Sequence, residues 1–229
     1  MGHAVAQAFS RAEAQLFLAG RSRATLDAVA DELATDGRSD VEEVDDDDYD
    51  AMQRHADRVL AAAGRITISF NAVGMDDVQG TPLHELENFM LPITQAARRH
   101  FNTTTAAAKR TISQGQGVIV LLTSSAAREW RHKMGGFSLA CESIEALNRT
   151  LAGELAGTGV RTVCIRANFT PQTAPGAPPE ALAPLLDDTL VPRLPYLSEV
   201  GAAAVSAASD GAGATTGAIL DLTSGAIVG

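Results

Sequence analysis

Three hydroxyl side chains, Thr123, Ser124 and Ser125, directly follow an unbroken apolar run at 118–122. Such a run, without period-2 alternation, is typical of a strand buried on both faces in a parallel sheet. Open α/β sheets bind ligands outside the carboxyl ends of their strands, so these hydroxyls lie where a ligand site is expected. The alternative role for a serine at a strand end is to form the turn.

Two further candidates for chemistry come later in the chain. The loop 128–133 is dense in polar groups, and His132 or Lys133 could give a proton to a bound substrate. Cys141 lies near the expected start of a helix, where a thiol can have a low pKa. The alternatives are a solvated loop and a small apolar packing role for the cysteine.

The elements that must position these residues follow from hydrophobic periodicity. Besides the apolar run at 118–122, strands are expected at 15–19, 40–44, 66–70, 160–165 and 218–222. Apolar residues at helical spacing predict helices at 2–14, from 26 to a stop at Gly37, and from the acidic run 45–48 to Gly64. They also predict a helix at 83–114 that is interrupted near Pro92, one in the region up to Leu155, and one at 198–208. Strands that alternate with helices indicate a doubly wound parallel α/β sheet in three layers, within a single domain.

The chain resembles the short-chain dehydrogenase/reductase family over nearly its whole length. The resemblance rests on Gly2, the turn Asn71-Ala72-Val73-Gly74, the segment 117–155, and a carboxyl end with Ala208-Ser209-Asp210, Thr216-Gly217 and Ser224-Gly225. The proline-rich connection at 170–197 is too long for a plain linker, so we expect it to be a mobile lid over the substrate. The resemblance implies a Rossmann-like fold over 1–229 and a homodimer or homotetramer. It also implies oxidation or reduction of a small carbonyl, alcohol or C=C compound with a nicotinamide cofactor.

The resemblance also implies a cofactor site. Gly2 is similar to the last glycine of the family's phosphate-binding turn, and Asn71 and Gly74 to its NNAG turn. Arg21 stands where a partner for a 2′-phosphate would lie, which favours NADP over NAD, although a solvated loop arginine is the alternative.

Two weaker cofactor matches complete the set. Asp45 resembles the aspartate that contacts the adenine amine, and Thr173 the threonine near the carboxamide. The acidic run at 45–48 would equally favour the positive end of the next helix without any ligand. We expect no metal site, because four adjacent carboxylates in a row do not converge on one point.

The catalytic positions differ from the family pattern. The family's tyrosine and lysine, four apart on a helix, correspond to Phe137 and Cys141, and its relay asparagine to Ala96. Ser125 remains as the serine at the strand end. Phe137 has no proton to donate and Cys141 carries no fixed charge, and the loss of a positioned acid alone typically lowers a rate by about 10²–10⁴. Ordinary catalysis of the family type is therefore doubtful.

The beginning of the chain also differs from the family pattern. A nucleotide-binding domain normally opens with a strand and a glycine-rich turn, whereas this chain begins with a helix and keeps Gly2 alone. That strand would be central, between 15–19 and 66–70. The interpretations left open are a mis-set start at Met1, a truncated product and a genuine variant without this strand.

Composition limits the partners. The formal net charge is −10, which argues against nucleic acid or an anionic membrane as partner. Two cysteines give no disulfide framework, and no apolar run reaches transmembrane length, so we expect a soluble cytoplasmic protein. Two functions remain open: a divergent NADP(H)-linked oxidoreductase, or a non-catalytic homologue that binds a nucleotide or assembles with other subunits.

Overall fold

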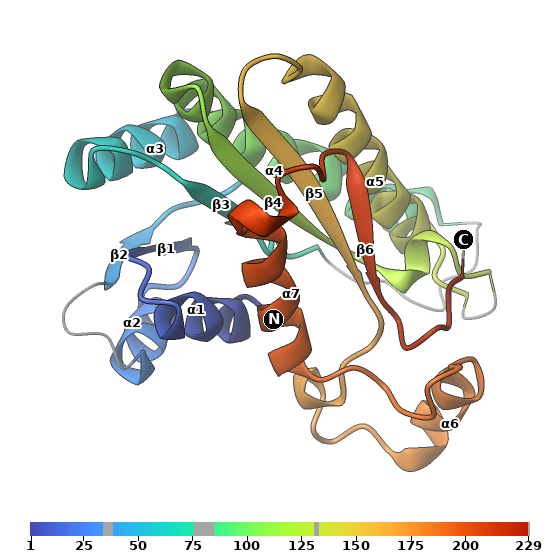
Figure 1. Ribbon diagram of the computed structural model, residues 1–229. Coiled ribbons are helices and arrows are strands. Elements are labelled where there is room, and N and C mark those ends of the chain that lie inside the picture. Colours follow the sequence, from blue (N-terminus) through green and yellow to red (C-terminus); the bar gives the residue numbers. More distant parts are fainter. Residues whose placement is uncertain (34–38, 76–84, 131–132, 229) are drawn as a thin grey trace.

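The computed structural model describes residues 1–33, 39–75, 85–130 and 133–228, and it places parallel strands between two helical layers (Figure 1). The strands are β1 Leu16–Gly20, β2 Ser39–Glu43, β3 Ile68–Asn71, β4 Gly117–Ser124, β5 Val160–Ala167 and β6 Ala218–Leu222. The α-helices are α1 Gly2–Arg11, α2 Arg23–Glu32, α3 Tyr49–Ala63, α4 Leu86–Gln114, α5 Gly136–Glu154, α6 Pro179–Asp187 and α7 Leu197–Ala208. The prediction of a doubly wound α/β fold is confirmed.

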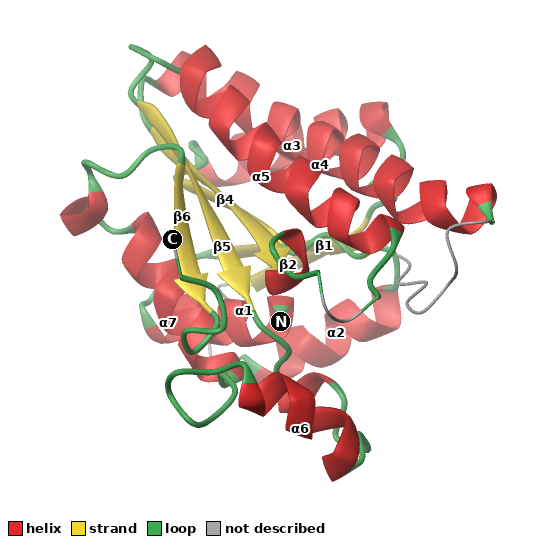
Figure 2. Cartoon of the chain, turned by 90° about the vertical axis from the view of Figure 1, so that its right-hand side faces the viewer, coloured by secondary structure: helices red, strands yellow, loops and turns green. Residues whose placement is uncertain are grey.

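The strands form two separate hydrogen-bonded sets. One sheet has the order β3-β4-β5-β6 and the other is the pair β1-β2, and every pairing is parallel. Helices α3, α4 and α5 lie on one side of the strands, and α1 and α7 on the other (Figure 2). Within the described residues no strand lies between β1 and β3. The loss of a strand ahead of Gly2 stays a prediction.

Strand β4 is a continuous apolar run because both of its faces are buried in the core. Its side chains alternate between the two faces, so Ile119 and Leu121 join the cluster under α4 and α5. Val118 and Val120 join the opposite cluster, which contains Val5 and Phe9 of α1 and Val200 of α7. Both faces are apolar because both are covered by helices, as in parallel sheets generally.

Two expectations about helix boundaries are wrong. Helix α4 runs unbroken through Pro92, because a proline removes one main-chain hydrogen bond and the buried packing of a 29-residue helix outweighs that loss. Helix α2 ends at Glu32, and the residue after it, Leu33, is extended and buried. Gly37, the expected stop, lies outside the described residues. Gly64 ends α3 in the left-handed conformation, as predicted.

In the described part of the chain no helix is both long and apolar enough to cross a lipid bilayer.

Candidate functional site

The carboxyl ends of the strands gather polar groups at one edge of the molecule. In Figure 2 the arrowheads of β5 and β6 point to the end of the molecule where α6 and the amino terminus lie. Ser125 follows β4 and Asn168 follows β5, while the 3-10 turn η1 (Ser125–Ala127) packs against α5. This edge is where doubly wound sheets place their ligands.

Ser125 is buried against a partner that sequence reasoning missed. Its Oγ lies 3.2 Å from Oδ1 of Asn168, and the two residues are only 4% and 2% exposed. The same Oδ1 accepts the N–H of Phe169 at 2.7 Å, which identifies it as the amide oxygen. Ser125 therefore donates its hydroxyl proton to Asn168, and its lone pairs are left as acceptors. Ser124, by contrast, caps η1 by accepting the N–H of Ala126.

Phe137 and Cys141 lie on α5, the helix that packs against the turn begun by Ser125. The hydroxyl of Thr123 donates to the carbonyl of Cys141 at 3.0 Å and so links β4 to α5. Cys141 is fully buried, and it lies in the second turn of the helix, beyond the N–H groups that could stabilise a thiolate. Full burial and this place in the helix favour the packing interpretation of Cys141.

The loop before α5 is described only in part. Trp130 is 84% exposed, and Lys133 takes a positive φ of 54° where the description resumes. Arg131 and His132, which include one of the two candidate donors, lie outside the described residues. The proposal of chemistry in this loop stays a prediction.

A buried ion network lies one turn beyond Cys141 on α5. Glu145, with no exposed surface, accepts two hydrogen bonds of 2.8 Å from the guanidinium of Arg166. Arg166 also donates to Asp221 at 2.7 Å, and these bonds raise its pKa. Burial raises the pKa of Cys164, and the charge of Glu145 raises it further, so this thiol stays protonated. These ion pairs link α5, β5 and β6 to one another.

Several residues expected at a nucleotide site lie close together. A Cβ on Gly2 would lie 3.3 Å from the Cβ of Ala72, so the first turn of α1 meets the turn after β3. A Cβ on Gly74 would lie 4.0 Å from Nη2 of Arg21, whose side chain therefore reaches from β1 toward β3. The start of α1 has no side-chain cap among the described residues, which leaves its N–H groups available for an anion.

The acidic run is organised by one buried arginine. Arg99 donates to Asp47 at 2.7 Å and to the carbonyl of Gly74 at 2.8 Å, and it lies 3.5 Å from Asp46. Hydrogen bonding to Arg99 lowers the pKa of Asp47, whereas burial raises that of Asp46. Asp45 accepts the N–H of Asp47, and Asp48 caps α3.

One expectation about these carboxylates needs correction. Oxygens of Asp45, Asp46 and Asp47 lie within 4.8 Å of one another, so three adjacent carboxylates do converge. The turn before α3 brings these three side chains together, which their adjacency in the sequence did not predict. The positive charge of Arg99 neutralises part of the negative charge of this cluster.

Asn71 and Thr173 have mainly structural contacts. The amide of Asn71 donates to the carbonyl of Val120 and fastens β3 to β4, and the residue is 4% exposed. Thr173 donates to the carbonyl of Thr170 at 2.7 Å within the 3-10 turn η2 (Pro171–Thr173). It lines a cavity of about 440 Å³ with His3 of α1, so it does lie near the first turn of α1.

Asn168, Arg99 and Glu145 are the residues that sequence reasoning missed. Asn168 directly follows a strand, and that position alone was a usable signal. The other two lie in the middle of amphipathic helices, where a charged residue ordinarily faces solvent.

Comparisons with known proteins agree with this architecture. A family model described as enoyl-(acyl carrier protein) reductase matches residues 1–226. D-threitol dehydrogenase of Mycolicibacterium smegmatis is 26% identical and aligns over 98% of this chain and 88% of its own. Galactitol 2-dehydrogenase (L-tagatose-forming) of Cereibacter sphaeroides is 29% identical, over 98% of this chain and 90% of its own.

Solved structures support the fold alone. A short-chain dehydrogenase from Bacillus anthracis superimposes with a TM-score of 0.88 at 22% identity, covering 100% of this chain and 92% of the other. A hydroxysteroid dehydrogenase from Escherichia coli gives 0.84 at 22% identity, covering 99% and 92%.

Proposed function

Since this chain belongs to the short-chain dehydrogenase/reductase family, we propose that it is a nucleotide-binding member that holds the adenosine end of NADP(H) without the family's usual proton transfer. One observation carries the proposal. The groups that could hold a phosphorylated adenosine lie together at one edge, whereas the two positions that would carry the proton chemistry hold Phe137 and a fully buried Cys141.

The adenosine half of the cofactor fits the residues present. The N–H groups in the first turn of α1 would bind the pyrophosphate, helped by the positive end of the helix dipole. Arg21 is exposed and would pair with a 2′-phosphate. Gly20, the last residue of β1, offers no carboxylate for the ribose hydroxyls. Both features favour NADP(H) over NAD(H).

The nicotinamide half does not fit as well. Bound NADPH would supply a hydride. Cys141, however, has no fixed positive charge with which to hold the ribose and assist a proton donor. The two lysines of the chain are Lys109 and Lys133, and Lys109 donates to Tyr49 on the outer face of α3 and α4.

A second function is favoured by the polar pair at the ends of β4 and β5. The lone pairs of Ser125 could accept a hydrogen bond from a substrate hydroxyl, and the curated relatives are named for polyol substrates. In this alternative the chain is an oxidoreductase of a small polyhydroxy or carbonyl compound, or of a C=C compound, with the proton supplied from elsewhere.

Calorimetric titration with fragments of the cofactor tests the first function. We expect NADPH and 2′,5′-ADP to bind with similar affinity, 5′-AMP to bind at least about tenfold more weakly, and nicotinamide mononucleotide to show no binding. Arg21→Ala should remove the preference for the 2′-phosphate, whereas Arg23→Ala, which removes an exposed pair with Asp27, should keep it. No binding of NADPH at millimolar concentration would overturn the proposal. Steady oxidation of NADPH with L-tagatose would favour the second function.

A further inference from the structure

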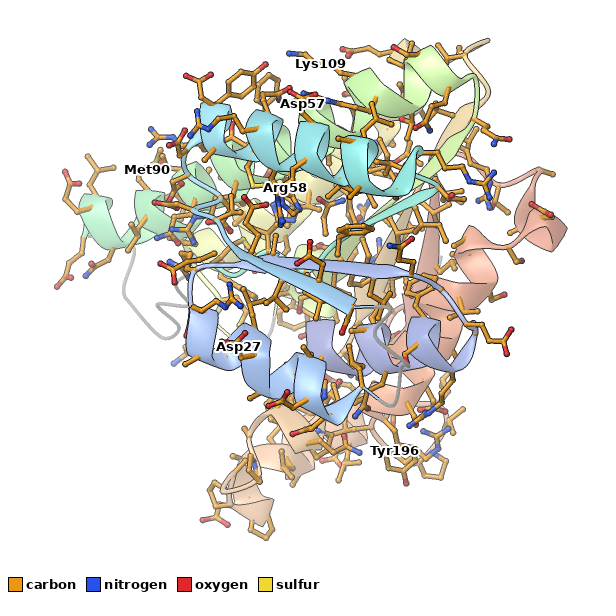
Figure 3. The ribbon with its side chains drawn as sticks, turned by 90° about the vertical axis from the view of Figure 1, so that its left-hand side faces the viewer. Asp27, Asp57, Arg58, Met90, Lys109 and Tyr196 are labelled. Atoms are coloured by element: carbon orange, nitrogen blue, oxygen red, sulfur yellow. The ribbon has the colours of Figure 1, made fainter. Side chains whose placement is uncertain are left out.

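A cavity of about 930 Å³ separates the two sets of strands. Its sides are formed by β1 and β3, one of its faces by α1, and the opposite face by α3 and α4. We call this cavity the slot. Figure 3 looks onto the β1-β2 pair, with α3 on one side of it and α1 and α2 on the other. The slot thus has the four boundaries that surround a central strand of a doubly wound sheet.

One side of the slot presents unpaired main-chain groups of β1. The carbonyl of Gly20 accepts the N–H of Val44, so Gly20 faces β2. Successive residues of a strand turn their N–H and C=O to opposite sides, so those of Phe17 and Ala19 face the slot. Within the described residues these groups have no hydrogen-bond partner.

The other side repeats this arrangement on β3. The carbonyl of Thr67 accepts the N–H of Val118, so Thr67 faces β4. By the same alternation the N–H and C=O groups of Ile68 and Phe70 face the slot, and in the described part of the chain nothing bonds them. Two unpaired strand edges, each belonging to a set of parallel strands, therefore face one another across the slot. Unpaired edges are templates for an added strand.

The faces of the slot are apolar on both sides. Val5 and Phe9 line it from α1, and Met52 and Val59 line it from α3. Strands β1 and β3 carry large apolar side chains that are only partly buried, whereas Ile119 in β4 is fully buried. An occupant with apolar side chains on both faces would cover them.

We propose that the slot binds an extended, continuously apolar peptide segment as a parallel strand that joins β1-β2 to β3-β4-β5-β6. Strands of five and four residues border it, so the paired core of the occupant spans about four or five residues, at about 3.3 Å each. A segment in this position pairs with both edges at once, so each of its residues uses its N–H and C=O. This inference does not depend on the proposed nucleotide binding.

Hydrogen–deuterium exchange with a synthetic peptide tests the inference on the full chain. The probe has the core Val-Ile-Val-Leu-Leu, copied from residues 118–122, with lysines at both ends for solubility. Its matched control has the same sequence with an N-methyl group on every amide of the core, which keeps the net charge and removes the N–H donors to both edges. We expect the probe to slow amide exchange at Phe17, Ala19, Ile68 and Phe70 by at least about tenfold, with smaller changes at Leu18 and Ser69, which already face a partner strand.

Three results would overturn the proposal: no protection at those four amides, the same protection with the N-methylated control, or protection that rises with protein concentration alone and so assigns the slot to a second copy. If the purified chain is unfolded, folding on addition of the probe but not of the control supports the proposal, and failure of both to induce folding contradicts it.

Discussion

The hydroxyl of Ser125 donates to the amide oxygen of Asn168 across 3.2 Å, and this bond joins the carboxyl ends of β4 and β5. The serine that a carbonyl-reducing site would use as a donor is thus turned toward the protein itself. This relationship leaves Ser125 with an accepting role, and it makes Asn168 a structural partner of the site.

Replacement of Asn168 by alanine should destabilise the protein. The change leaves the Ser125 hydroxyl and the N–H of Phe169 without their acceptor in a buried place, and each such loss costs about 1–3 kcal/mol. Urea denaturation should show a lower free energy of unfolding. Asn168→Asp keeps an acceptor at the same place and should lose less; equal losses in the two variants would contradict the role assigned to the amide oxygen.

Neutralisation of Glu145 should destabilise more strongly. Glu145→Gln leaves the buried guanidinium of Arg166 with a neutral partner, and breaking a buried pair typically costs about 3–5 kcal/mol. The matched control is Glu142→Gln on the same helix, a carboxylate that pairs with exposed Arg128 and Arg149, which should change stability by less than about 0.5 kcal/mol. Thermal unfolding compares the two variants, and similar shifts would refute a special role for the buried pair.

His100 should make the protein sensitive to mild acid. Burial lowers its pKa from 6.5 to about 4, against a smaller opposing effect of its bond to the carbonyl of Ala96. Because the folded-state pKa lies below the unfolded value, the contribution to stability is complete above pH 6.5 and is lost as pH falls toward 4. Between pH 6.5 and 5 the loss should be about 2 kcal/mol. His100→Gln should flatten this part of the pH profile of unfolding, and an unchanged slope would rule His100 out as its source.

Gly20→Asp should reverse the nucleotide preference. A Cβ at this position meets only Leu26 at ordinary contact distance, so the carboxylate can be accommodated. It would accept hydrogen bonds from the ribose hydroxyls of NADH and repel a 2′-phosphate. Titration with NADH and NADPH should show the ratio of the two affinities inverted relative to the parent chain. Gly20→Ala is the control, and a reversal in that variant too would show that the carboxylate is not the cause.

The double change Phe137→Tyr with Cys141→Lys should create or raise reductase activity if the site is otherwise intact. The pair is four residues apart on one face of α5, and a positioned proton donor is worth about 10²–10⁴ in rate. The lysine enters a fully buried place, so a lower thermal midpoint is expected along with the gain. NADPH oxidation with L-tagatose measures activity, and Phe137→Tyr alone should gain less. A folded but inert double variant would count against an intact site.

The order of most elements was readable from the sequence because it depends on local patterns, although helix α6 in the proline-rich connection was not predicted. The apolar run in β4 and the stop of α3 at Gly64 each follow from the types of a few neighbouring residues. The altered pair Phe137 and Cys141 was equally visible, because spacing along one helix determines which residues share a face. Boundaries failed where packing outweighed a local signal, as at Pro92 inside the long helix α4.

The contacts between distant segments were decided only by the tertiary structure. Ser125 and Asn168 are 43 residues apart, and Asp47 and Arg99 are 52 apart. No periodicity encodes such pairs, because they depend on which strand ends and helix faces the chain brings together. The unpaired edges of β1 and β3 belong to the same class. The residue types of a strand determine its tendency to be extended, whereas its neighbours in space determine whether its N–H and C=O groups are hydrogen-bonded.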